Sequence, residues 1–308
     1  MSYSSDVKTE LTEIAIKKRE LRRAELAGIV YFASTLSLGR GLSLMISTEH
    51  MDVVRRAISL IEKLYTVEFE LSAREQLPKK TLTYVIKISK HTDTMIVMDD
   101  LGLEIGAGIH PRDDIFETVI RTENECKCFA RGAFLGGGSI SDPQKSYQME
   151  FVTAQQSLAE PLLQLMKKWK INAKGTTRKQ DFVVYLKESE SIIELLTRIG
   201  AVSSLLEIEN IKIMKSINND VNRASNFELA NMERTVASSD ENIRCILRIK
   251  ETVGLDSLPK NLQEMAELRL AHPDESLAEL AQLSGSMTKS GINHRLRKIR
   301  EIAGAIPE

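Results

Sequence analysis

The sequence predicts an α+β protein in which a tandem αββαββα domain over residues 1–205 is followed by an all-helical domain over residues 206–308. Three observations support this. From about residue 20 to residue 205 the chain passes twice through the same order of helical and extended segments. Apolar residues recur at i, i+3, i+4 and i+7 in the helical segments and alternate in the extended ones. Beyond Leu205 the alternation stops, and every remaining segment has helical periodicity.

The first repeat covers about residues 20–105. A helix rich in small residues is expected over residues 24–36, an extended segment over 42–47 and an amphipathic helix over 51–65. Two extended segments follow, over 67–73 and 81–89, and a helix over 93–101 closes the unit. The strand over 81–89 shows the pattern clearly, because Leu82, Tyr84, Ile86 and Ile88 alternate with other residues.

The second repeat covers about residues 120–205. Its expected elements are a helix over 123–135, a hairpin around 138–141 and 147–153, a helix over 157–169, extended segments over 171–177 and 181–187, and a helix over 191–199. The closing parts of the two repeats also read alike, as YVIKISKHTDTMIVMDDLG beside VVYLKESESIIELLTRIG. We therefore expect the two repeats to share one fold.

In the C-terminal domain, helices are expected over residues 208–237, 240–252, 262–271, 277–283 and 288–302. Gly254 and Pro259 separate the second of these from the third, since glycine commonly ends a helix and proline commonly starts one.

Composition limits the function. Hydrophobic residues make up 42% of the 308 residues and charged residues 28%, which is ordinary for a folded globular protein. No apolar run approaches the ~20 residues of a membrane span, and the first residues are charged where a signal peptide is apolar. We expect a cytoplasmic protein without a membrane partner. The formal net charge is −1, so DNA binding would have to come from local basic patches.

The three cysteines are expected to be reduced structural thiols. Cys126, Cys128 and Cys245 are odd in number, and no further ligands lie near the first two at zinc-site spacing. No metal and no cofactor are predicted.

Residues 275–303 carry the clearest local signal. Ser276 and Glu279 form a capping-box pattern at the start of a short helix. Residues 284–286, Ser-Gly-Ser, end that helix, and a second helix begins near Thr288 with Ile292 and Leu296 on its inward face. Two short helices joined by a tight turn are typical of a helix-turn-helix, whose second helix enters the major groove of DNA.

The outward face of the second helix is basic, and residues 284–300 contain no acidic residue. Side chains near the start of such a helix reach base edges, and later basic residues hold phosphates. The alternative is a basic, solvated helix at the end of an ordinary bundle. The predicted DNA-binding residues of this helix are Thr288, Lys289, Ser290, Asn293, His294, Arg297, Lys298 and Arg300.

Asparagine is unusually frequent between residues 219 and 231, in a segment of otherwise helical rhythm. Because asparagine is a poor helix former, something else should favour it there. Amide contacts with DNA or with the other domain would explain it, and so would a capped junction between two helices. The residues concerned are Asn219, Asn222, Arg223, Asn226 and Asn231.

The first helix of each repeat contains small residues where large ones would be expected, in AELAGIVYFASTLS (24–37) and CFARGAFLGGGSISD (128–142). Glycine inside a helix costs up to ~1 kcal/mol of helix propensity. Close backbone contact between the two helices would offset that cost. The predicted contact positions are Ala27, Gly28, Ala33, Gly132, Ala133, Gly136 and Gly137.

The segments LAGIVYFAS (26–34) and ARGAFLGGGSIS (130–141) resemble the two motif copies of LAGLIDADG homing endonucleases. With GLDSLP (254–259) and KSGINHRLRKIRE (289–301), the whole chain resembles the WhiA family of bacterial sporulation and cell-division regulators. The resemblance implies a saddle-shaped, homing-endonuclease-like domain followed by a helix-turn-helix. It implies a nucleoid-associated transcription regulator that binds double-stranded DNA, with roles in cell division, chromosome segregation and, in sporulating bacteria, sporulation. Other transcription or cell-division proteins would be further partners.

In the endonucleases each motif ends with an acidic residue that binds the catalytic metal. The matching positions here are Ala33 and Gly137, and neither can supply the oxygen ligands that a divalent cation requires. The resemblance therefore predicts a protein without catalytic residues. Asp142 is the only acidic residue near these positions in the sequence. A structural role in the turn before Pro143 explains this aspartate better than a metal-binding role.

Basic residues on or between the predicted strands could track DNA phosphates: Lys87, Lys90, Lys174, Arg178, Lys179 and Lys187. Acidic residues such as Glu68 and Glu70 give the same surface a mixed charge. A role of this fold in protein contacts or dimerisation is therefore nearly as well supported as a role in DNA binding. Two alternatives to a transcription regulator stay open: a scaffold for cell-division proteins and a divalent-metal DNA endonuclease.

Overall fold

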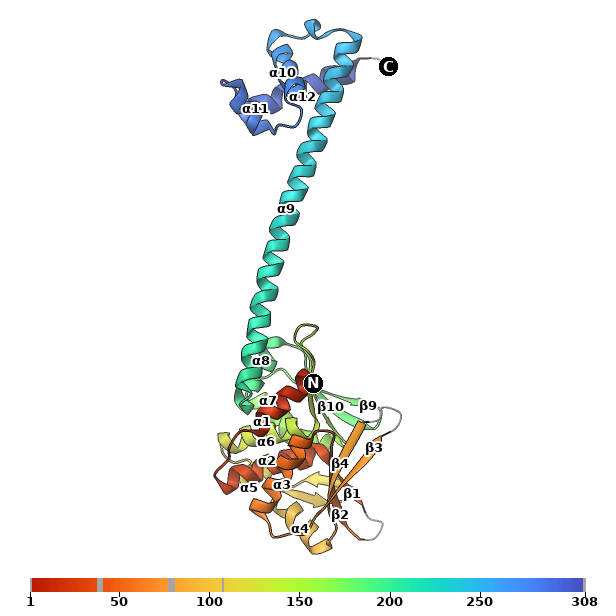
Figure 1. Ribbon diagram of the computed structural model, residues 1–308, viewed down its shortest axis with the longest axis vertical. Coiled ribbons are helices and arrows are strands. Elements are labelled where there is room, and N and C mark those ends of the chain that lie inside the picture. Colours follow the sequence, from red (N-terminus) through yellow and green to blue (C-terminus); the bar gives the residue numbers. More distant parts are fainter. Residues whose placement is uncertain (1, 38–40, 77–80, 107, 307–308) are drawn as a thin grey trace. The chain divides into compact units, whose positions relative to one another are not determined.

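The computed structural model describes residues 2–37, 41–76, 81–106 and 108–306. The chain forms two compact units, Met1–Ile213 and Met214–Glu308, which are described separately (Figure 1). The units divide beyond the boundary predicted after residue 205, because Ile208 is buried in the core of the first unit. Within the described residues, none of the helices combines the length and the apolar character that crossing a membrane requires.

The first unit contains two copies of one arrangement, each a four-stranded antiparallel sheet with helices. The sheet of the first copy has the order β1-β2-β4-β3 and that of the second β7-β8-β10-β9. The first copy consists of α2 (Arg19–Ala33), β1 (Ser34–Ser37), β2 (Ser43–Thr48), α3 (Met51–Leu64), β3 (Glu70–Gln76), β4 (Thr81–Ile88) and α4 (His91–Asp100). The second consists of α6 (Glu123–Gly137), β7 (Gly138–Ile140), β8 (Met149–Thr153), α7 (Gln156–Lys168), β9 (Lys174–Arg178), β10 (Asp181–Leu186) and α8 (Ser189–Ile199). The tandem αββαββα fold predicted from the sequence is confirmed.

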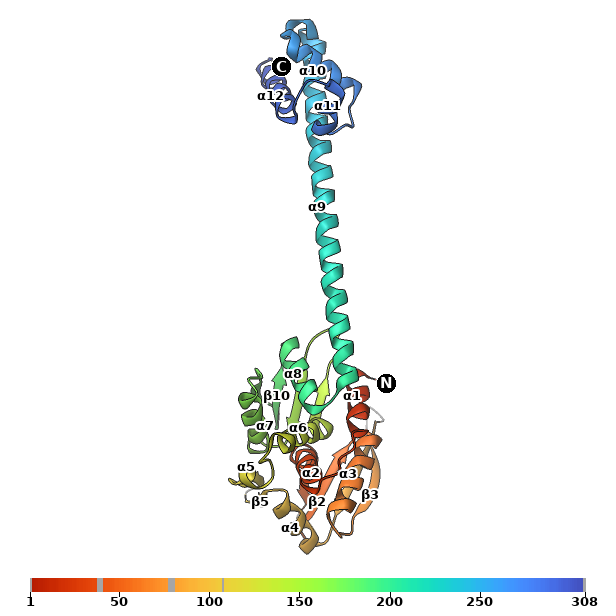
Figure 2. The same cartoon turned by 90° about the vertical axis from the view of Figure 1, so that its left-hand side faces the viewer.

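Outside the repeats, the described part of the first unit also contains α1 (Tyr3–Thr12), β5 (Leu103–Ile105), β6 (Ile109–Pro111), α5 (Ile115–Thr118) and the start of α9 (Val202–Thr252). In Figure 1 the helices lie on one side of the two sheets, and none of the described helices covers the other face. In Figure 2 the helices of this layer face the viewer.

In the first unit, the predicted end of the first helix was wrong. Residues 34–36 were expected to continue the first helix, but α2 ends at Ala33 and Ser34 begins β1. Ser34 pairs with Ile46, and Thr35 with Met45. Hydroxyl-bearing and β-branched residues favour a strand over a helix when a partner strand is present.

The helices α2 and α6 pack against each other with their backbones in near contact. A Cβ atom added at Gly132 would lie 1.9 Å from the carbonyl oxygen of Glu25, and one at Gly28 would lie 2.1 Å from that of Phe129. Ala27 and Ala133 are fully buried in the same interface. Only a residue without a side chain fits at these two glycines.

A buried ionic network lies beside this contact. The carboxylate of Glu25 is fully buried and receives Arg56 Nε at 2.6 Å and Arg131 Nη1 at 3.1 Å. Burial raises the pKa of Glu25, and the two guanidinium groups oppose that shift. Arg131 Nε also donates to the carbonyl of Ile199, so the network joins α2, α3, α6 and the end of α8.

Cys126, Cys128 and Cys245 are free thiols. Cys126 and Cys128 are buried, and burial raises the pKa of Cys128 to about 11. That thiol is therefore protonated near neutral pH, as suits a structural residue.

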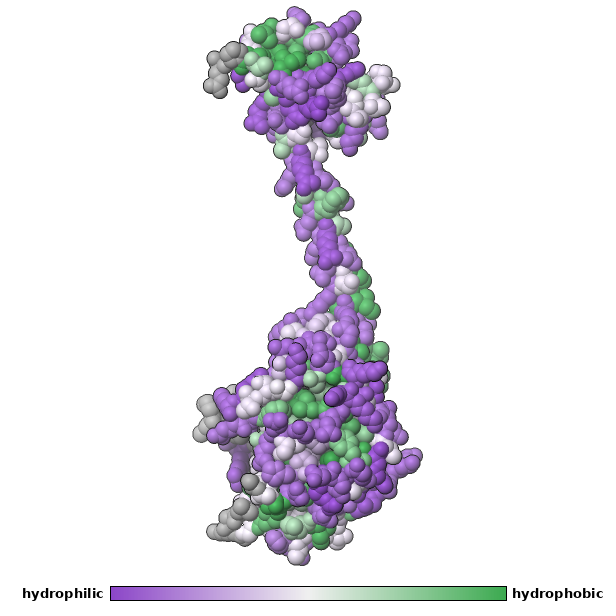
Figure 3. Space-filling model, turned by 180° about the vertical axis from the view of Figure 1, so that it is seen from behind, coloured by the Kyte–Doolittle hydropathy of each residue, from purple (hydrophilic) through white to green (hydrophobic). Residues whose placement is uncertain are grey.

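The second unit is entirely helical. It contains most of α9 (Val202–Thr252), a short 3-10 helix (Leu255–Ser257), α10 (Lys260–Ala271), α11 (Leu277–Ser284) and α12 (Lys289–Ala305). Gly254 has a φ of 81° at the end of α9, and Pro259 precedes α10, so these residues separate two helices as their types predict. Exposed apolar side chains, among them Ile217, Val221 and Met232, interrupt the hydrophilic surface of α9 (Figure 3).

The break predicted between residues 237 and 240 is absent, and α9 is continuous there. Contacts within the second unit stabilise the helix at this point. Ser239 is buried, and its hydroxyl donates to the carbonyl of Pro273 at 2.5 Å. Asn242 is buried one turn later.

Replacing Gly132 by alanine is expected to destabilise the first unit by roughly 3 kcal/mol or more, because the methyl group would have to displace backbone atoms. Urea unfolding of the full chain, followed by circular dichroism, measures the effect. Gly304→Ala in α12 is the control, since nothing lies within 4 Å of its added Cβ. That variant should be neutral or stabilised by up to ~1 kcal/mol. A Gly132→Ala protein that unfolds like the wild type would contradict the packing described.

Candidate nucleic-acid interface

The helix α11 begins and ends where the sequence signals lie, and α12 begins at the predicted position but extends to Ala305, three residues beyond the predicted end. The backbone N–H of Glu279 donates to Ser276 Oγ at 3.3 Å, and that of Ser276 donates to a carboxylate oxygen of Glu279 at 2.7 Å, which completes the capping box. Gly285 adopts a φ of 65° and ends α11. The hydroxyl of Thr288 accepts the N–H of Gly291 at 3.2 Å and starts α12. Local hydrogen bonds thus fix the turn between the two helices.

The helix α12 is held in the unit by one narrow stripe. Ile292, Leu296, Ile299 and Ala303 are buried, with spacings of four, three and four residues. They belong to one apolar core with residues of α9, α10 and α11. Because this stripe occupies one side of the helix only, the opposite side faces solvent.

The predicted DNA-binding residues lie on that solvent side, apart from one. The exposed ones are Thr288, Lys289, Ser290, Asn293, His294, Arg297 and Lys298. Arg300 is half-buried, and its Nη1 lies 3.0 Å from a carboxylate oxygen of Glu241. Arg297 makes a longer pair with Glu301, at 3.5 Å, between two highly exposed side chains, and such pairs are weak. Residues 289–296 of α12 therefore present basic and amide groups to solvent, and the first acidic residue of the helix is Glu301.

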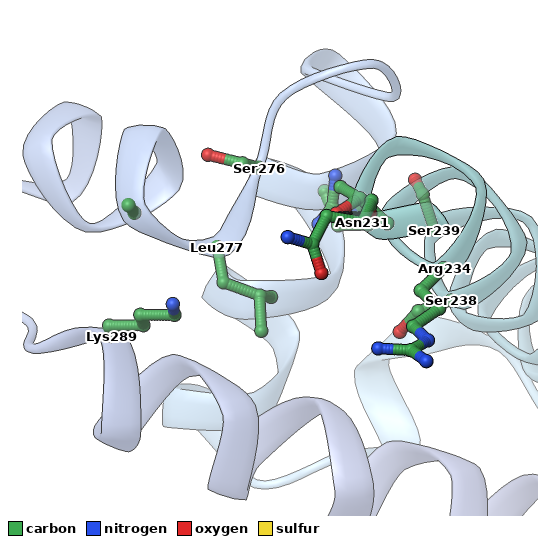
Figure 4. A pocket seen from close by; sticks show the side chains of 10 residues that line it. Asn231, Arg234, Ser238, Ser239, Ser276, Leu277 and Lys289 are labelled. Atoms are coloured by element: carbon green, nitrogen blue, oxygen red, sulfur yellow. Dashed lines mark hydrogen bonds between the residues drawn. The ribbon is translucent and has the colours of Figure 1, made fainter. Parts of the chain in front are cut away.

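Residues from other helices extend this surface, and sequence reasoning missed most of them. A pocket of about 440 Å³ within the second unit is lined by Asn231 and Arg234 of α9, Arg269 of α10, Leu277 of α11 and Lys289 of α12 (Figure 4). Of the asparagine-rich run, only Asn231 lines this pocket. Asn219, Asn222 and Asn226 are exposed along the continuous helix α9, so they cap no junction.

The six basic residues proposed for the sheets of the first unit have mixed surroundings. Arg178 pairs with Glu150 through both of its terminal nitrogens, at 2.9 and 3.2 Å, and this pairing lowers the pKa of Glu150. Lys90 lies 3.7 Å from Asp93, Lys87 stands opposite Glu70 in the register of β3 and β4, and Lys187 lies over the ring of Tyr185. Lys174 and Lys179 are exposed and make no ion pair within the described part of the chain. Nearby acids thus offset much of the positive charge on this surface.

Ala33 and Gly137, the positions that the motif resemblance matches to the endonuclease acids, lie at the ends of α2 and α6. At Gly137 an added Cβ would lie 2.2 Å from the carbonyl oxygen of Val152 and 2.9 Å from that of Phe32. Among the described residues, no group of three or more histidine, cysteine or acidic side chains could hold a metal ion. Asp142 accepts the N–H of Gln144 at 2.9 Å and so stabilises a turn.

Three parts of the chain match domains of one family. Residues 19–103 match the WhiA N-terminal LAGLIDADG-like domain, residues 126–218 the WhiA LAGLIDADG-like domain, and residues 221–303 the WhiA C-terminal HTH domain. The chain belongs to the WhiA family. The resemblance inferred from the sequence motifs is thereby confirmed.

Relatives match over the full length. A probable cell division protein WhiA of a Thermoanaerobacter species is 44% identical over 317 residues, covering 100% of this chain and 99% of the relative. A protein of the same name from Exiguobacterium sibiricum is 40% identical over 312 residues, with coverage of 99% and 97%. The crystal structure of full-length DUF199/WhiA from Thermatoga maritima is similar with a TM-score of 0.62 and 26% identity, over 100% of both chains.

Proposed function

We propose that the protein is a DNA-binding transcription regulator whose helix α12 reads the major groove. The observation that carries the proposal is the one-sided anchoring of α12. Its apolar stripe is buried, and its opposite face is exposed, basic and free of acidic residues up to Glu301, within a domain that matches a helix-turn-helix family. A recognition helix needs such a free face to enter a groove about 12 Å wide.

The exposed side chains divide into two roles by their place along α12. Lys289, Ser290, Asn293 and His294 occupy the first turns, where a recognition helix meets base edges. Lysine bonds guanine acceptors and asparagine bonds adenine, so this set supports sequence-specific binding. Arg297 and Lys298 follow on the same side and suit phosphate contacts. We leave Arg300 out of this set because Glu241 already holds its guanidinium.

The cellular role follows from the relatives. They carry the name probable cell division protein WhiA, and we infer that this protein regulates genes of cell division. Roles in chromosome segregation and sporulation, association with the nucleoid, and contacts with other transcription or cell-division proteins rest on the family resemblance alone. The proposed cytoplasmic location rests on the sequence, which has no apolar run long enough for a membrane span.

We further propose that the first unit has no nuclease activity and serves protein contacts, dimerisation or weak phosphate contacts. Ala33 and Gly137 stand where the endonucleases place their metal-binding acids, and the space around Gly137 admits no side chain without displacing backbone. The mixed charge of the sheets favours contacts with protein over strong binding to DNA.

Replacing Asn293 or Arg297 by alanine should weaken binding to a genomic site enriched with the tagged protein. The expected loss is ~1–3 kcal/mol for a side chain that contacts a base. A phosphate contact would instead weaken binding to all sequences and lower the slope of log affinity against log salt by about one. Gel-shift titrations over a range of salt concentrations distinguish the two roles.

Lys250→Ala is the control for these titrations. Lys250 is exposed on α9. Arg248, two residues earlier, bonds the carbonyl of Ile306 beyond the far end of α12. A helix of 17 residues is about 25 Å long, so this lysine lies far from the proposed contacts. Wild-type affinity in both Asn293→Ala and Arg297→Ala would remove α12 as the recognition helix. Weak binding that is independent of sequence in the wild type would favour the scaffold alternative.

The full-length protein should leave supercoiled plasmid intact in Mg²⁺ or Mn²⁺, since the positions of the metal-binding acids hold alanine and glycine. Gly137→Asp should lower stability rather than create activity, because its Cβ would meet the carbonyl of Val152. Agarose gels and thermal unfolding measure the two effects. Metal-dependent nicking by wild type that disappears in Asp142→Ala would establish the endonuclease alternative.

A further inference from the structure

The pocket shared by α9, α10, α11 and α12 contains three basic side chains. Arg234 comes from α9, Arg269 from α10 and Lys289 from the first position of α12. In the close view, Asn231, Arg234 and Lys289 extend from two different helices toward the same cavity (Figure 4). No acidic side chain is among the residues that line it. All the residues involved belong to the second unit.

None of the three basic residues forms an ion pair with an acidic side chain in the described part of the chain. Arg234 and Lys289 are exposed and form no ion pair within the described chain. Arg269 is 1% exposed. Its Nη1 donates to the carbonyl oxygens of His272, Pro273 and Glu275, but its Nε is buried without a hydrogen bond. Burial lowers the pKa of Arg269, and the carboxylate of Glu275 opposes this shift only in part. An anion that approached the buried guanidinium would therefore stabilise its charged form.

The start of α11 adds hydrogen-bond donors to the same pocket. Leu277 and Ala278 are the first two residues of this helix and line the cavity. The N–H groups of Leu277 and Ala278 have no acceptor within the helix, and the helix dipole places partial positive charge there, which the capping carboxylate of Glu279 offsets in part. Ser276 caps the helix and lies at the pocket as well. Phosphate groups bind readily at such sites.

We propose that this pocket binds a phosphate of the DNA backbone at the edge of the groove that α12 reads. The inference rests on the proposed function and adds α9 and α10 to the DNA-binding surface. Lys289 links the two regions, because it lines the pocket and is followed on α12 by the exposed Ser290 and Asn293, which are proposed to meet the bases. A phosphate held by Arg234 and the start of α11, beside Lys289, would fix the register of α12 along the duplex.

Arg234→Gln in the full-length protein tests the assignment without touching the residues proposed to face bases. Binding to the enriched site and to unrelated DNA of equal length should weaken by a similar factor, about tenfold, and the salt slope should fall by about one. The preference for the enriched site should be retained. Lys250→Gln is the matched control and should bind like the wild type.

The position of the phosphate is tested with duplexes that carry single neutral methylphosphonates. At one backbone position the neutral group should weaken binding of the wild type but leave Arg234→Gln unchanged, since the variant has already lost that contact. Unchanged affinity and salt slope in Arg234→Gln, beside specific binding by the wild type, would overturn the pocket assignment and keep the proposed function. Failure of the wild type to bind any DNA would overturn both.

The pocket could also bind a phosphate group that is not part of DNA, such as that of a small phosphorylated ligand. Titration of inorganic phosphate into the protein without DNA, followed by the change in melting temperature, should give a larger shift for wild type than for Arg234→Gln, and a methylphosphonate at the contacted position should still weaken DNA binding. A stabilisation that Arg234→Gln abolishes, together with no effect of any methylphosphonate, would assign the pocket to a small phosphorylated ligand and contradict the backbone contact.

Discussion

The second unit depends on one packing constraint, which is that α12 is held by a single apolar stripe. Ile292, Leu296 and Ile299 are buried among residues of the other three helices. A wider apolar face would bury the helix, and a narrower one would release it. Because the stripe fixes both the position and the rotation of α12, it also decides which side chains reach solvent. The capping hydrogen bonds of Ser276 and Thr288 set where the two helices start, and hence how far along α12 the free face begins.

In the first unit, close packing accounts for both the fold and the proposed loss of catalysis. The backbones of α2 and α6 approach so closely at Gly28 and Gly132 that no side chain fits between them. The same proximity continues to Gly137, where a metal-binding aspartate would collide with the carbonyl of Val152. The small residues that join the two repeats thus also occupy a position that a nuclease would need for chemistry.

The features that depend on neighbouring residues were predicted correctly from the sequence. The errors concern features that contacts between distant residues determine. The two repeats and the capping box depend on neighbouring residues, so the sequence could predict them. The continuity of α9 depends on the contact of Ser239 with Pro273, and Arg300 is held by Glu241, 59 residues away. The pocket was missed for the same reason, since Arg234 joins Lys289 only through the packing of α9 against the other helices.

Methylation interference tests the central claim most directly. The enriched duplex is treated so that each molecule carries one methyl group, either on a guanine N7 in the major groove or on an adenine N3 in the minor groove, and bound and free fractions are then compared. If α12 lies in the major groove, N7 methylation at a few guanines of the site should exclude the duplex from the bound fraction, and minor-groove methylation there should not. Interference confined to the minor groove, or absent at every position, would contradict the account.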